Sequence, residues 1–113
     1  MQAMELIVYK KTEVLLNNTY PILKNFPKSE KIALCQEIKQ AFYALLKDIV
    51  LANNLKYKKR QFQDEADAYL KLLYVLFSVA KQQKYITEKK NMLIQLRLDE
   101  IGRLLGGWMK SSK

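Results

Sequence analysis

The sequence of 113 residues contains no histidine, one cysteine, three glycines and two prolines. Without histidine, the chain cannot build Ser–His–Asp or Cys–His catalytic arrangements or ligate a metal through imidazole. Cys35 alone cannot form an intrachain disulfide or a cysteine-rich zinc site, and a single thiol suits a reducing cytoplasm. The glycines form no phosphate-binding glycine-rich loop. These absences leave little for enzyme chemistry, so we expect a non-enzymatic protein with no catalytic residue, metal or cofactor.

Long apolar runs are missing as well. Charged residues interrupt every long hydrophobic stretch, and none reaches the roughly 18 residues that a membrane span needs. The first residues, MQAMELIVYKK, have no basic region ahead of an apolar stretch, so we expect no signal peptide. With 50% hydrophobic and 27% charged residues, the composition indicates a globular chain. We therefore predict one domain over residues 1–113, located in the cytoplasm and not associated with a membrane.

What the sequence does contain is helical periodicity. Apolar residues recur at steps of three and four, which is typical of amphipathic helices. We predict four helices, at about Met4 to Asn25, Ser29 to Asn53, Gln61 to Gln83 and from Thr87 onward. Ser29 and Thr87 are the expected N-caps, because their hydroxyls can accept from a backbone amide of the first turn. Four helices of similar length joined by short loops predict an all-α, antiparallel up-down four-helix bundle.

The apolar lines predict which faces turn inward. The first helix carries the line Leu6, Tyr9, Glu13, Leu16 and Tyr20, and the second carries Ile32, Cys35, Ile38, Phe42, Leu45, Ile49 and Ala52. The fourth helix carries Ile94, Leu98, Ile101, Leu105 and Trp108. Because Cys35 lies on such a line, we interpret its thiol as a small buried hydrophobe.

Helices three and four carry more apolar residues than one bundle core needs. A bundle helix requires about three inward positions per heptad, and both helices show a second apolar line. A self-association surface would use this surplus, although surface leucines are common and need no explanation by themselves. The residues predicted for such an oligomer interface are Leu70, Tyr74, Phe77, Leu96, Leu104 and Trp108.

Charge is the most informative part of the composition. Twenty basic residues against eleven acidic ones give a net charge of +9 and a pI near 9.6, which favours nucleic acid as a partner. Residues 28–60 hold eight of the basic residues and three of the acidic ones. The densest cluster lies between helices two and three, at Lys56, Lys58, Lys59 and Arg60, with Tyr57 available to stack on a base. We predict nucleic-acid contact at this cluster, the alternative being a solvated loop that serves solubility.

Further lysines extend the predicted nucleic-acid surface. Lys24, Lys28 and Lys31 surround the first turn, at the opposite end of the second helix from the 56–60 cluster. Lys39 and Lys47 lie along that helix, and with Lys31 they follow steps of eight residues, which spiral slowly around its surface. One continuous basic patch on a single chain is therefore not expected, and an oligomer would bring the clusters together.

Three segments resemble a known family. They are ELIVYKK…YPILKNFPKSEKIAL at residues 5–34, QEIKQAFYALLKDIVLAN at 36–53 and DEIGRLLGGWMKS at 99–111. Together they resemble the accessory variability proteins (Avd) of diversity-generating retroelements. They also resemble the related four-helix-bundle proteins encoded in intervening sequences of large-subunit ribosomal RNA genes. FPKSEK is common to both branches, whereas GRLLGGW favours the Avd branch.

The resemblance implies a barrel-shaped homopentamer of four-helix bundles with a basic surface. It also implies a function: a non-catalytic accessory subunit that binds the reverse transcriptase and RNA or cDNA during mutagenic reverse transcription. The alternative is a scaffold or protein-interaction subunit of the intervening-sequence type, without direct nucleic-acid binding. The family has no short catalytic motif to transfer onto this chain.

Overall fold

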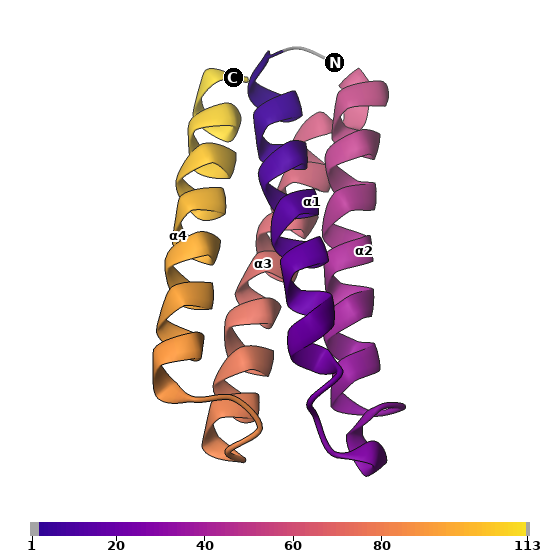
Figure 1. Cartoon of the computed structure of the whole chain (residues 1–113). Helices are drawn as coiled ribbons and strands as arrows, with labels where there is room; N and C mark the ends of the chain where they lie inside the picture. The colour runs from indigo at the N-terminus through magenta and orange to yellow at the C-terminus, as the bar shows by residue number, and fades with distance from the viewer. Residues whose placement is uncertain (1–2, 113) are drawn as a thin grey trace.

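The computed structural model describes residues 3–112, and in this range it contains helices and no strand. The four α-helices are α1 (Ala3–Leu23), α2 (Leu34–Asn54), α3 (Lys59–Gln82) and α4 (Glu88–Ser111). Two short 3-10 helices, η1 (Lys28–Glu30) and η2 (Lys56–Lys58), precede α2 and α3. Successive helices run in opposite directions along one axis (Figure 1). The predicted all-α, up-down arrangement of four packed helices is thus confirmed.

Each helix packs against two neighbours, and α2 and α3 form the most extensive pair. The neighbours of α1 are α2 and α4, and the same two helices flank α3, which places α1 and α3 diagonally across the bundle. The bundle measures 42 × 25 × 19 Å. The α2–α3 turn lies at one end, together with the start of α1 and the end of α4 (Figure 1). The α1–α2 and α3–α4 turns share the opposite end, which we call the two-turn end.

The core follows the predicted lines closely on α2 and α4. Their buried apolar residues are Cys35, Ile38, Ala41, Phe42, Leu45, Ile49 and Ala52 on α2, and Ile94, Leu98, Ile101, Leu105 and Trp108 on α4. The rings of Phe42 on α2 and Phe77 on α3, both fully buried, meet edge to face with centroids 6.3 Å apart. Burial of each large side chain stabilises the fold by about 1.5–3 kcal/mol.

The prediction for the inner face of α1 is wrong in part. Leu6 is exposed, whereas the buried face includes the polar residues Glu5, Thr12 and Thr19 beside apolar ones such as Val8. Each threonine hydroxyl donates to the carbonyl four residues earlier, at 2.8 Å, so its polarity is satisfied within the helix. A prediction based on apolar residues alone cannot show that a buried threonine hydroxyl is hydrogen-bonded within its own helix.

The start of α2 also differs from the prediction. Ser29 lies inside η1 and caps no helix, and α2 begins at Leu34. Ile32, expected in the core, is 84% exposed. The Glu30 carboxylate connects this segment to two places: one oxygen accepts from the Leu34 amide at the start of α2 (3.4 Å) and the other from the Tyr85 hydroxyl (2.8 Å). A local capping pattern contains no sign of the tertiary contact to Tyr85.

Thr87 is the N-cap of α4, as predicted. Its hydroxyl accepts from the backbone amide of Lys90 at 3.0 Å. Although Gly106 and Gly107 have low helix propensity, α4 continues through both to Ser111.

Candidate nucleic-acid and assembly surfaces

The 56–60 cluster lies at the α2–α3 end, on η2 and the first turn of α3. Tyr57 is 80% exposed, and the Lys58 ammonium lies 5.8 Å from the centroid of its ring. Arg60 forms an ion pair with Asp64 (Nε to Oδ1, 3.3 Å), so part of its charge is already compensated. The cluster is solvent-facing, as a phosphate-binding surface requires.

A cavity of about 620 Å³ adjoins this cluster, lined by Lys56, Tyr57, Lys59, Arg60, Gln63 and Ser112. Gln63 is fully buried; its Nε2 donates to the Ser112 hydroxyl at 3.3 Å, and its Oε1 has no hydrogen-bond partner. Sequence reasoning missed both residues, because 49 positions separate them and no local motif connects them.

The two-turn end gathers more lysines than the sequence suggested. The 24–31 turn, with Lys24, Lys28 and Lys31, lies beside the α3–α4 turn, because Tyr85 bonds Glu30 and its ring packs 5.4 Å from that of Phe26. The additional lysines on the α3–α4 side are Lys81, Lys84, Lys89 and Lys90. Sequence reasoning missed these four; the signal was available, since in an up-down bundle the first and third turns share an end.

Lys31 has a structural partner at this end. Its ammonium donates to the carbonyls of Leu23 and Lys24, each at 2.7 Å. These carbonyls belong to the C-terminal end of α1, where a cation also opposes the negative end of the helix dipole. Lys31 therefore caps α1 in addition to contributing positive charge.

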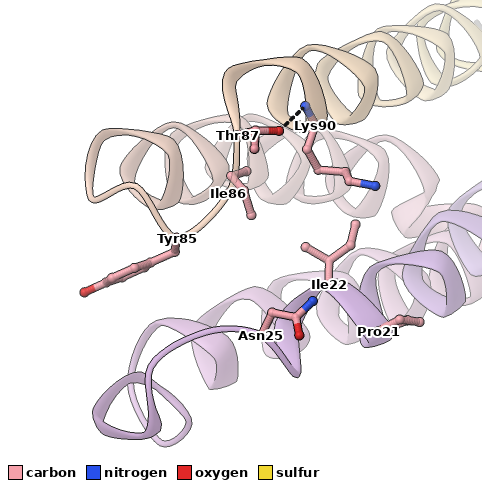
Figure 2. A pocket seen from close by; sticks show the side chains of 7 residues that line it. All are labelled: Pro21, Ile22, Asn25, Tyr85, Ile86, Thr87 and Lys90. Atoms are coloured by element: carbon pink, nitrogen blue, oxygen red, sulfur yellow. Dashed lines mark hydrogen bonds between the residues drawn. The ribbon is translucent and has the colours of Figure 1, made fainter.

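A second cavity, of about 310 Å³, lies between the end of α1 and the α3–α4 turn. Figure 2 shows its lining: Ile22 from α1 faces Lys90 and Ile86, Asn25 borders the space, and the Tyr85 side chain points away from it. Its lining combines apolar side chains, such as Ile22 and Ile86, with polar ones, such as Asn25 and Lys90. This cavity borders the lysines of the two-turn end.

The remaining predicted cations lie on α2, between the two ends. The Lys39 ammonium lies 4.6 Å from the centroid of the Tyr20 ring, on the side of α2 that faces α1. Lys47 is exposed. Two lysines on different sides of the helix do not join the basic ends into one patch.

The structure corrects half of the predicted oligomer interface. Leu70, Phe77 and Trp108 are buried in the core of the chain itself, so they offer no surface to another copy. Leu70 and Phe77 belong to the second apolar line of α3, which faces the core, and Trp108 belongs to the inner line of α4.

The other three predicted interface residues are accessible to different degrees. Leu96 is 61% exposed, and Leu104 packs against the core while remaining partly accessible. Tyr74 is half-buried and donates a hydrogen bond to Asp99, between α3 and α4. Burial, followed by this bond to a carboxylate, raises the pKa of Tyr74 to about 12.

Among the exposed apolar side chains, which also include Leu6, Tyr43 and Met92, two groups lie on different sides of the bundle. One group lies on the neighbouring helices α1 and α4 and consists of Met4, Ile7, Val14, Leu93 and Leu96. The other follows the outer side of α3 at helical spacing and consists of Leu72, Val75 and Val79. We call these the α1–α4 face and the α3 face.

We searched the described residues for metal-binding groups and for helices that could span a membrane. Within residues 3–112 no group of three or more histidine, cysteine, aspartate or glutamate side chains is placed to hold a metal ion. None of the four α-helices described is long and apolar enough to cross a bilayer.

Cys35 is buried, and this burial raises the pKa of its thiol, which keeps the thiol in the protonated form.

The fold and these surfaces define a class of protein: a basic four-helix bundle with charged ends and two exposed apolar faces. Residues 6–112 match the family model described as bAvd-like, and the chain belongs to this family. The match covers nearly the whole sequence and agrees with the resemblance seen in its three segments. No curated protein matches the chain.

Proposed function

We propose that this protein is the accessory subunit of a diversity-generating retroelement. In this function it binds the reverse transcriptase and RNA or cDNA during mutagenic reverse transcription, in the cytoplasm, and performs no catalysis itself. The observation that carries the proposal is the match to the bAvd-like family over residues 6–112. Proteins of this family are accessory and non-catalytic, which accords with a chain that has no histidine.

The charge distribution supports nucleic-acid binding. The net charge of +9 is concentrated at the two ends of the bundle. Lys56 and Lys58 are exposed at one end, and Lys24 and Lys28 at the other. Lysines that contact phosphates release counterions, so the affinity should fall steeply with salt and depend little on base sequence.

The two exposed apolar faces support assembly into a homopentamer. A ring needs two different, complementary surfaces on each subunit, so that every copy contacts the next head to tail. The α1–α4 face and the α3 face lie on different sides of the bundle and suit this geometry. A pentamer would multiply the positive charge of the single chain and so strengthen its field for RNA or cDNA.

The proposal is tested by co-purification with a retroelement reverse transcriptase from the same genome, whose gene we expect to lie beside the gene of this protein. We expect the tagged enzyme to retain the protein, and the complex to retain template RNA at low salt and release it as salt rises. Bovine serum albumin and a reverse transcriptase from an unrelated element serve as negative controls. If neither the neighbouring enzyme nor RNA is retained at low salt, the proposed function is wrong.

Part of the structure favours the alternative of a scaffold that does not bind nucleic acid. Lys31 caps α1, Arg60 is paired with Asp64, and Lys39 lies over Tyr20, so these cations have structural partners. Retention of the enzyme without any retention of RNA would favour this alternative.

A further inference from the structure

Lys84 has a backbone conformation that lysine rarely adopts. Its φ is +66°, and no other non-glycine residue described in the chain has a positive φ. It follows the end of α3, where the amide of Tyr85 bonds the carbonyl of Ala80 at 2.9 Å and that of Lys84 bonds Lys81 at 2.9 Å. Glycine is the usual residue at such a left-handed helix end, because it has no Cβ to clash. Lysine at this position therefore costs stability that glycine would not.

Lys84 belongs to the group of lysines at the two-turn end. It lines a cavity of about 350 Å³ at the α3–α4 turn with Lys81 and Thr87. Tyr85 ties this turn to the 24–31 turn through Glu30. The cations gathered here are Lys24, Lys28, Lys31, Lys81, Lys84, Lys89 and Lys90.

Little of this charge is neutralised inside the chain. The acidic residues at this end are Glu30, which accepts from Tyr85 and Leu34, and Glu88, which lies 3.9 Å from Lys81. Among residues 3–112, no carboxylate forms an ion pair with the lysines Lys24, Lys28, Lys84, Lys89 and Lys90. At the α2–α3 end Arg60 is likewise paired with Asp64, and Lys56, Lys58 and Lys59 form no ion pair within residues 3–112, so the two-turn end differs by its larger number of unpaired lysines, five against three in the 56–60 cluster.

We propose that the two-turn end is the principal contact of this protein with the phosphodiester backbone of single-stranded nucleic acid. Lys84 occupies its unfavourable conformation because its charge is needed there. This inference rests on the proposed function and assigns its nucleic-acid contact to one end of the bundle. Exposed lysines are depleted in protein–protein interfaces and common in phosphate contacts, which favours nucleic acid over an acidic protein as the ligand.

The decisive variant is Lys84→Gly, because it separates stability from binding. Removal of the Cβ relieves the backbone, so the melting temperature should rise. Removal of the charge should lower affinity for a fluorescent 20-nucleotide RNA several-fold and reduce the slope of log affinity against log salt by about one. Lys56→Gln is the matched control: it removes one charge from the opposite end and should leave affinity within about twofold of wild type.

A pair of triple variants extends the test without depending on the backbone of one residue. Lys28→Gln, Lys84→Gln and Lys90→Gln combined should weaken RNA binding at least tenfold. Lys56→Gln, Lys58→Gln and Lys59→Gln combined remove the same charge and should weaken it less than threefold. Binding of single-stranded DNA should follow RNA, since the phosphodiester is common to both.

Other results would overturn the inference. Unchanged affinity in Lys84→Gly, or equal losses in the two triple variants, would remove the assignment to the two-turn end and leave the proposed function standing. Competition by polyglutamate as strong as by RNA would show a general anion surface and also contradict the inference. Failure of the wild-type protein to bind any RNA at low salt would overturn nucleic-acid binding itself.

Discussion

At the scale of single residues, Asp48 shows how burial changes the chemistry of a side chain. It is 4% exposed on α2, and its Oδ2 has no hydrogen-bond partner. Burial, followed by the nearby carboxylate of Glu65, raises the pKa of Asp48 to about 6. In the unfolded chain an aspartate has a pKa of about 3.9, so the ionised form of Asp48 is disfavoured in the folded protein.

This predicts that Asp48→Asn stabilises the protein in a pH-dependent way. Above pH 6 the wild type buries a charge that asparagine does not carry, so the variant should be more stable by about 2 kcal/mol. As the pH falls through 6, Asp48 takes up a proton in the folded state, and the advantage of the variant should disappear near pH 4. Urea unfolding at pH 4, 6 and 8 measures this.

The matched control is Asp67→Asn on the surface of α3. Asp67 pairs with Lys71 at 2.9 Å, so its removal should cost a few tenths of a kcal/mol at pH 8 and give no gain. A destabilising effect of Asp48→Asn at pH 8, or one that does not change with pH, would contradict the interpretation of Asp48.

Lys31 supports a second prediction at this scale. Lys31→Met removes two charge-assisted bonds to the end of α1 and should lower stability by about 1 kcal/mol. Lys28→Met, three residues earlier and exposed, should stay within about 0.5 kcal/mol of wild type. Thermal melts compare the two variants, and equal effects would show that Lys31 does not cap α1.

At the scale of elements, α4 tolerates two glycines in its last turns because the bundle holds it in place. A Cβ at position 106 would meet no atom within 4 Å, whereas one at position 102 would lie 3.4 Å from a methyl group of Leu70. The two positions therefore differ in the room they offer, although both are helical.

We predict that Gly106→Ala stabilises α4 by about 0.5–1 kcal/mol, because alanine has the higher helix propensity and meets no obstacle. Gly102→Ala should gain less, since Leu70 has to move. Urea unfolding of the two variants measures the difference. A loss of stability in Gly106→Ala would mean that another molecule packs against this surface.

At the scale of the whole molecule, the two apolar faces decide how copies can associate. Val75 belongs to the α3 face and Leu96 to the α1–α4 face. If each face contacts the other face of a neighbour, a defect in either one prevents the ring from closing.

This predicts a distinctive mixing experiment. Val75→Glu and Leu96→Glu should each give monomers, because either places a charge in an apolar contact. An equimolar mixture should form dimers, since one variant keeps an intact α1–α4 face and the other an intact α3 face. Light scattering after size exclusion measures the masses, with Ile32→Glu as an exposed control that leaves the assembly unchanged.

Two results would count against the head-to-tail ring. Variants that both remain assembled would show that these faces are not the contacts. Variants that each form dimers on their own, without mixing, would indicate symmetric interfaces in which each face contacts itself.

The features of this protein that depend on local pattern follow from its amino-acid sequence alone. The stripes of α2 and α4, from Ile38 to Ile49 and from Ile94 to Trp108, follow from the helical period, because a buried face repeats every 3.6 residues. The N-cap at Thr87 follows from a hydroxyl next to its own helix. The concentration of positive charge in residues 28–60 is likewise a matter of composition.

The features that depend on distant residues follow from the packing of the bundle instead. Packing buries Thr12 and Thr19, whose hydroxyls bond within α1, and it joins Glu30, next to Ser29, to Tyr85, 55 positions away. It also joins the lysines of the 24–31 turn to those around Lys84, since antiparallel packing places alternate turns at one end. Helical periodicity is a property of neighbours along the chain, whereas these contacts depend on which surfaces the bundle brings together.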